Sequence, residues 1–281
     1  AMACACLIAL AADDVSRRQL LHVPQTQSML AHLINQIRPT PSTPTLPSNA
    51  TAPIMSCLYT FTEDLFSQVR LLTVHPEPEA LPEIVLAVLM PAPWWWAPLY
   101  TDDPEVKEAA QADAAMVLRA LLGTENNCRV LRQRHTMQTV VPGWYVKLVY
   151  DVQALMDCSN PRTVEVASQV LTALVAAGGI HWLAQDVELL ESLTKRMTKM
   201  MSGVEGAAKR PYAAEAAEAM FLMAGGKEAR REQEAAVKTL LGALAEATVV
   251  GLVRSAASML QMASTEDGPR TAAARLLRVL L

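Results

Sequence analysis

Aromatic residues are scarce in this chain and make up 5% of its 281 residues. Alanine, leucine, valine and methionine dominate instead, and the unbranched side chains among them lose little rotamer freedom in a helix. Hydrophobic residues make up 52% of the chain and charged residues 19%, which excludes a disordered polar chain. Because almost no segment alternates with a period of two residues, the sequence predicts an all-α protein with a substantial core.

Cysteine is rare as well, and its pattern excludes a disulfide scaffold. The five cysteines are odd in number and scattered: Cys4, Cys6, Cys57, Cys128 and Cys158. Cysteines inside apolar segments behave as small hydrophobic residues, and disulfides are uncommon in reducing compartments. Cys4 and Cys6 have no second pair at zinc-site spacing, so we expect no metal. We expect an intracellular, reducing location, with the cytoplasm as the compartment.

The chain lacks a strong charge of either sign and lacks a long apolar run. Residues 1–141 carry 9 basic and 13 acidic side chains, and residues 142–281 carry 15 of each. Proteins that bind nucleic acid through its phosphates usually carry a basic excess, so nucleic acid is not the expected partner. The longest apolar runs have about ten residues, and a transmembrane helix needs about 20, so no membrane span is predicted.

Enzyme motifs are also missing. The sequence has no glycine-rich nucleotide loop, no Gly-x-Ser-x-Gly and no His-Glu-x-x-His. Its five histidines are dispersed, and a lone histidine beside apolar residues is more often a packing residue than a catalyst. We therefore expect a protein that is not an enzyme and that holds no cofactor.

Proline divides the chain into an irregular N-terminal part and a regular C-terminal part. Residues 39–53 hold five prolines and no charge, which is typical of a linker or surface loop. A second proline-rich stretch extends from Pro76 to Pro104 and is interrupted by a short helical stretch at 83–90. The predicted parts are N-terminal helices at 1–38, the linker at 39–53, a helix with a Pro/Trp-rich segment at 54–102, and a helical-repeat domain at 103–281.

Helix start and stop signals recur through the regular part. Asp103-Pro104 and Asn160-Pro161 each combine an N-cap residue with proline at the first helical position. Apolar residues at helical spacing then predict helices from 104 to Gly123, 144–156, 161 to Gly178-Gly179, 180–201, 211 to Gly225-Gly226, 228–248, 251–263 and from 269. Starts near 103, 160, 210 and, less marked, 250 lie roughly 57, 50 and 40 residues apart, and these spacings bracket the period of helical solenoid repeats.

The residues that carry these signals resemble the armadillo-like (ARM/HEAT) helical-repeat family over about residues 100–281. Residues 160–179 resemble the second helix of an armadillo repeat, and residues 103–122 are similar, with residues 144–154 in the place of a third helix. The resemblance implies a right-handed α-solenoid of stacked amphipathic helices. The groove Asn and Trp ladder of nuclear-import receptors is absent, so no peptide-binding residues can be transferred from that family.

Two groups of residues are candidate partner-binding sites. Trp94, Trp95 and Trp96 lie among prolines that disfavour a helix, so adjacent indoles point in different directions and at least one is expected to face a partner. Basic side chains cluster between helices at Arg129, Arg132, Arg134, Lys195, Arg196, Lys199, Lys209 and Arg210.

The sequence leaves two functions open. The first is a non-enzymatic scaffold that mediates protein–protein interaction as a subunit of a larger assembly. The alternative is a helical-repeat protein that binds RNA through a basic ridge, which requires the basic clusters to share one face.

Overall fold

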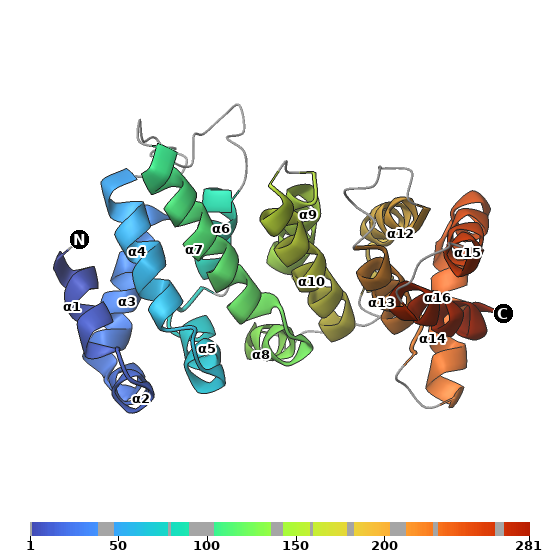
Figure 1. Cartoon of the computed structure of the whole chain (residues 1–281). Coiled ribbons are helices and arrows are strands. Elements are labelled where there is room, and N and C mark those ends of the chain that lie inside the picture. The colour runs from blue at the N-terminus through green and yellow to red at the C-terminus, as the bar shows by residue number, and fades with distance from the viewer. Residues whose placement is uncertain are drawn as a thin grey trace. The chain divides into compact units, whose positions relative to one another are not determined.

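The computed structural model describes residues 2–38, 48–77, 80–89, 104–135, 143–157, 160–178, 183–202, 212–226, 230–261 and 267–281. These residues form fifteen α-helices, and the described part of the chain contains no strand (Figure 1). The predicted all-α class is thereby confirmed. None of the described helices is long and apolar enough to cross a membrane.

The contacts divide the chain into two compact units. Unit 1 comprises Ala1–His135 and Ala154–Val170, and unit 2 comprises Thr136–Gln153 and Leu171–Leu281. The boundaries fall inside α9 (Gly143–Leu155) and α10 (Pro161–Gly178), so each of these two helices contributes residues to both units.

Unit 1 is built by packing each helix against the helix three places later in the chain (Figure 1). The first row contains α1 (Met2–Leu10), α4 (Ser48–Thr60) and α7 (Pro104–Leu122), with α1 against α4 and α4 against α7. In the second row, α5 (Leu65–Leu72) packs against both α2 (Asp14–His22) and α8 (Glu125–His135). The third pairs α3 (Pro24–Ile37) with α6 (Ala80–Leu89). Packing between successive sets of three helices is therefore a regular feature of this unit.

In unit 2, two helices also pack against the helix three places later in the chain. In it, α12 (Val187–Ser202) packs against α15 (Glu246–Gln261), and α13 (Ala213–Met223) packs against α16 (Asp267–Leu280). The helices α12 and α13 also contact each other, as do α15 and α16, while α14 (Arg230–Ala243) contacts α12 and α16. Near the start of this unit, the buried Tyr145 hydroxyl donates a hydrogen bond to the Leu174 carbonyl, so a polar group is satisfied inside the core.

Local signals in the sequence account for most helix ends. The Asn160 side chain accepts hydrogen bonds from the amides of Arg162 and Thr163 at 3.0 and 3.4 Å, which confirms the predicted start of α10. At the end of α13, Gly225 has a φ of 73°, and the Gly226 amide donates to the Phe221 carbonyl at 2.9 Å. A residue without a Cβ adopts this conformation at little cost, so the predicted Gly225-Gly226 stop is confirmed.

The predicted linker at 39–53 needs a correction at its C-terminal end. Residues 39–47 lie outside the described part, but α4 begins at Ser48 and contains Pro53. Because proline lacks an amide hydrogen, it removes one hydrogen bond near the start of this helix. Packing compensates for this loss, since α4 lies between α1 and α7 and buries Ile54 and Met55 fully.

The following segment is more helical than predicted. Residues 54–89 hold the rest of α4, all of α5 and all of α6, whereas the sequence predicted one helix and a Pro/Trp-rich irregular segment over 54–102, with a short helical stretch at 83–90. The helix α6 buries nearly every side chain, from Ala80 to Leu89 with Glu83 half-buried, and a helix that is apolar all round is stable only when its neighbours cover it.

Two predicted helices in unit 2 have different boundaries. The helix expected at 180–201 starts at Val187, because the Asp186 carboxylate caps it by accepting from the Leu189 amide at 2.9 Å. The expected break near residue 250 lies instead between Ala243 and Glu246. Gly251, where the second of these helices was expected to start, lies inside α15, and a Cβ there would be in ordinary van der Waals contact with Thr198 Cγ2 on α12 at 3.6 Å.

Candidate functional site

The tryptophan run cannot be placed. Trp94, Trp95 and Trp96 lie outside the described residues, and so do Lys209 and Arg210. Arg132 and Arg134 belong to α8, but their side chains are outside the described part as well. The predicted role of these seven residues in partner binding stays a prediction.

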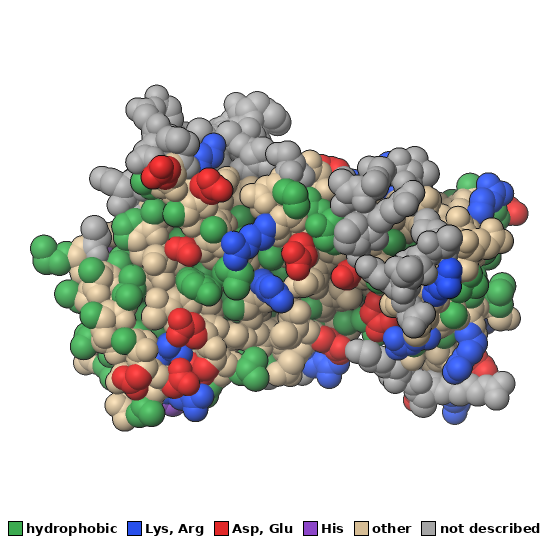
Figure 2. All heavy atoms as spheres, viewed as in Figure 1, with side chains coloured by type: hydrophobic (Ala, Val, Ile, Leu, Met, Phe, Trp, Pro, Cys, Tyr) green, Lys and Arg blue, Asp and Glu red, His purple; other side chains and the backbone are tan. Residues whose placement is uncertain are grey.

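The candidate basic residues whose side chains are described lie on α8 in unit 1 and on α12 in unit 2. Arg129 is exposed on α8 and pairs with Glu125 one turn earlier. On α12, Lys195 and Lys199 are exposed and Arg196 is half-buried. Figure 2 shows basic and acidic side chains interspersed over the described part of the visible face. On α12, Lys195 Nζ lies 3.1 Å from Glu191 Oε1, one helical turn away, so Arg129 and Lys195 each have a carboxylate beside them.

Glu191 joins two helices as well as pairing with Lys195. Its carboxylate accepts hydrogen bonds from the Thr248 hydroxyl at 2.5 Å and from the Ala245 amide at 3.3 Å. Both donors lie at the start of α15, where the first amides of a helix need acceptors from outside it. The sequence suggested a solvated ion-pair face here, and the structure adds a hydrogen-bonded link from α12 to α15.

The hydrogen bond from Thr248 lowers the pKa of Glu191, and Lys195 and the Ala245 amide act in the same direction. A carboxyl whose pKa is lower in the folded state stabilises the fold above its ordinary pKa of 4.5, and this stabilisation is lost as pH falls through the folded-state pKa. We therefore predict that Glu191→Gln lowers the free energy of unfolding by about 1 kcal/mol at neutral pH.

The difference between the wild type and Glu191→Gln should shrink as the pH is lowered from neutral to below 4.5. Urea unfolding at a series of pH values measures it. Glu108→Gln on the exposed side of α7 is the control, and a difference for Glu191→Gln that does not change with pH would contradict the assignment.

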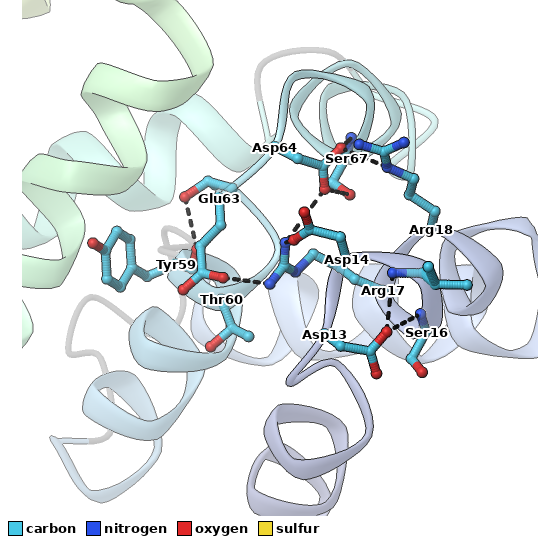
Figure 3. Close-up of polar contacts among 12 residues, drawn as sticks. Asp13, Asp14, Ser16, Arg17, Arg18, Tyr59, Thr60, Glu63, Asp64 and Ser67 are labelled. Carbon is cyan, nitrogen blue, oxygen red and sulfur yellow. Dashed lines mark hydrogen bonds and ion pairs between the residues drawn. The ribbon is translucent and has the colours of Figure 1, made fainter.

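Sequence reasoning missed a buried ionic cluster between α2 and the start of α5 (Figure 3). The Arg17 side chain is 1% exposed, and its guanidinium contacts three carboxylates: Asp14 at 2.8 Å, Asp64 at 3.4 Å, and Glu63. Arg18, which is 52% exposed, reaches Asp64 at 3.2 Å. The partners at 63 and 64 are far from Arg17 in sequence, so no local pattern distinguishes Arg17 from Arg18.

Asp64 connects this cluster to a helix end. Its carboxylate accepts hydrogen bonds from the Ser67 amide at 3.1 Å and the Ser67 hydroxyl at 2.5 Å, and it caps α5. Burial raises the pKa of Asp64, but the hydrogen bonds from Ser67 and Arg17 outweigh burial and hold it below its ordinary value. The carboxylate is therefore charged at neutral pH and fixes α2 against α5.

Two further polar links lie between helices of unit 1. Arg38 Nη2 lies 3.0 Å from Glu83, and Arg38 also contacts Glu77, so the end of α3 is held to α6 and the turn before it. The buried Asn127 of α8 donates 3.0 Å hydrogen bonds to the Gln68 side chain on α5 and to the Ala120 carbonyl on α7. These links fix the positions of neighbouring helices, and polar side chains 20–60 residues away in the sequence supply most of the partners.

The described cysteines are free thiols. Cys4, Cys57 and Cys128 are buried and Cys6 is exposed, while Cys158 lies outside the described residues. Burial raises the pKa of the Cys57 thiol to about 12, with Cys4 adding to the effect. Since the thiolate is the reactive form, Cys57 is an inert packing residue at neutral pH. Among the described side chains, no group of three or more His, Cys, Asp or Glu could hold a metal ion.

No protein-family model matches this chain, and no curated protein matches it. Two solved structures are similar, both described as crystal structures of engineered proteins from the Northeast Structural Genomics Consortium. The first has a TM-score of 0.51 at 13% identity and covers 98% of this chain and 96% of its own. The second has a TM-score of 0.50 at 12% identity and covers 98% and 94%. At such low identity the likeness concerns the fold alone, and what it shows is an all-helical, repeat-like architecture.

Proposed function

We propose that this protein is a non-enzymatic, armadillo-like helical-repeat scaffold that binds other proteins as a subunit of a larger assembly. The observation that carries the proposal is the packing of α1 to α5 each against the helix three places later, which recurs in unit 2 for α12 with α15 and for α13 with α16. A repeat of three helices cannot bury its apolar faces alone and must stack on its neighbours. Such stacking leaves long rows of exposed helix faces, which are the surfaces that repeat proteins use for binding.

The helix order supports the armadillo type of repeat. Three successive helices form one set, and the first helices of the sets in unit 1 begin at Met2, Ser48 and Pro104. On this assignment the repeats include the N-terminal part of the chain and extend beyond the 103–281 region. Right-handed stacking is part of the proposal.

Charge pairing favours a protein partner over RNA. Arg129 and Lys195 each have a carboxylate within ion-pair distance, and an RNA phosphate would have to compete with it. The net charge of −4 also gives no long-range attraction for a polyanion. Lys199, exposed on the same helix α12, is then a stronger candidate contact for an acidic segment of a partner protein than Lys195, because Lys195 is paired with Glu191.

The test is the size and composition of the native complex. We expect the tagged chain, purified from its own cells, to elute well above its 30.5 kDa mass with protein partners and to keep them after nuclease treatment. Lys199→Glu on α12 should weaken the binding of an acidic partner. Lys238→Glu on the exposed side of α14 is the matched control.

Loss of the complex after nuclease treatment would favour the RNA alternative. In that case an electrophoretic shift with RNA should weaken steeply between roughly 50 and 300 mM salt. A chain that purifies alone, without protein or RNA, would contradict both functions.

A further inference from the structure

Cys4 and Cys6 lie two residues apart on α1, but the fold gives them different environments. Each residue of a helix turns the chain by about 100°, so residues two apart point to opposite sides. Cys4 is accordingly buried, whereas Cys6 is exposed. Of the two, Cys4 is therefore the one that faces the interior of unit 1.

The side chain that Cys4 meets there is a third cysteine. The helix α1 packs against α4 (Figure 1), and Cys57 of α4 is fully buried. The two thiols share a side-chain hydrogen bond, in which Cys57 is the donor because the bond favours its protonated form. A hydrogen bond brings two sulfur atoms nearly into contact. The fold thus joins two thiols that are far apart in the sequence.

The buried cysteine of α8 shows that a second thiol is not needed to bury the first. The Cys128 thiol donates a hydrogen bond to the Leu122 carbonyl at 3.1 Å. A backbone carbonyl is enough to satisfy such a weak donor, and a cysteine of this kind is a small packing residue. The Cys4–Cys57 pair differs from it because the neighbouring group is itself a thiol.

We propose that Cys4 and Cys57 form a reversible disulfide bond in the presence of glutathione disulfide, which ties α1 to α4. The thiolate of Cys4 attacks one sulfur of glutathione disulfide, whose S–S bond breaks as the first glutathione leaves. The thiolate of Cys57 then attacks Cys4 Sγ in the mixed disulfide and releases the second glutathione. The two cysteine protons end on the two glutathione thiols, so two cysteines are oxidised and one glutathione disulfide is reduced.

The burial of the pair determines when this exchange takes place. The raised pKa of Cys57 keeps its thiol protonated and unreactive while α1 is packed on α4. Exchange therefore takes place in local openings that expose both thiols. When α1 returns to α4, the new bond is buried and protected from attack by reduced glutathione.

The bond and the fold should favour each other by the same factor. A disulfide between Cys4 and Cys57 closes a loop that contains α2 and α3, so it restricts the unfolded chain. A disulfide that fits the native structure typically favours the fold by about 30- to 1,000-fold. By linkage, folding raises the equilibrium constant for forming that disulfide by the same factor.

Equilibration of the 281-residue chain in glutathione buffers tests the proposal. The wild type is held at neutral pH over a series of ratios of reduced to oxidised glutathione, once folded and once unfolded in urea. Free thiols are then alkylated, and the linked peptides are identified by mass spectrometry. We expect a Cys4–Cys57 cross-link whose equilibrium constant is about a hundredfold larger in the folded chain than in the unfolded chain.

Cys6→Ser is the matched control, because Cys6 lies on the same helix and is exposed. This variant should keep the full preference for the Cys4–Cys57 bond in the folded chain, whereas Cys57→Ser should abolish the cross-link of Cys4. An equilibrium constant that is no larger in the folded chain, or a folded-chain cross-link from Cys6 in place of Cys4, would overturn the proposal. The proposal does not rest on the scaffold function, and either result leaves that function standing.

Discussion

Replacing Arg17 by methionine is expected to lower the free energy of unfolding by about 3 kcal/mol, the largest effect of a single polar substitution in unit 1. Methionine fills much of the space of the buried aliphatic stem but leaves Asp64, whose side chain is 10% exposed, without its buried partner. The value lies at the low end for a broken buried ion pair, because Asp14 and Glu63 are 67% and 49% exposed and can be hydrated.

Arg18→Met is the control for this prediction, since Arg18 is the neighbouring residue, contacts the same Asp64 and is half-exposed. An exposed ion pair contributes about 0–1 kcal/mol, so Arg18→Met should have a small effect. Urea unfolding followed by circular dichroism measures both variants, and amide exchange in α2 and α5 locates the loss. Equal losses for the two variants would show that burial of Arg17 does not matter.

Replacing Asn127 by alanine is expected to cost about 2 kcal/mol of folding free energy. The side-chain amide bridges α5 and α7 from a position on α8 that is 1% exposed. Its removal leaves the Ala120 carbonyl, one of the last carbonyls of α7, and the Gln68 side chain without this donor in a buried site.

The adjacent residue provides the control. Asn126 is exposed on the same helix, so Asn126→Ala should change the unfolding free energy by less than about 0.5 kcal/mol. Thermal or urea unfolding of the two variants at neutral pH separates them. A cost for Asn127→Ala as small as that for Asn126→Ala would show that water replaces the bridge.

The two predictions concern residues that look ordinary in the sequence. Arg17 is followed by Arg18 and Asn127 is preceded by Asn126, and in each pair one side chain is buried and the other is exposed. Helical periodicity indicates that two adjacent residues cannot share a face, but it does not tell which of two polar residues finds partners. Glu63 and Asp64 lie in the turn before α5, and Gln68 lies on α5, so packing between segments far apart in the sequence makes the choice.

The sequence by itself determined the helical class and several of the helix ends in the C-terminal part. Caps and stops such as Asn160-Pro161 and Gly225-Gly226 act through atoms within a few residues, so they can be recognised without knowledge of the rest of the fold.

The tertiary structure alone decided which helices meet, and it overrode local signals where packing was strong enough. Pro53 and Gly251 would each end a helix on local preference, yet both lie inside helices because α4 is packed between α1 and α7 and α15 is packed on α12.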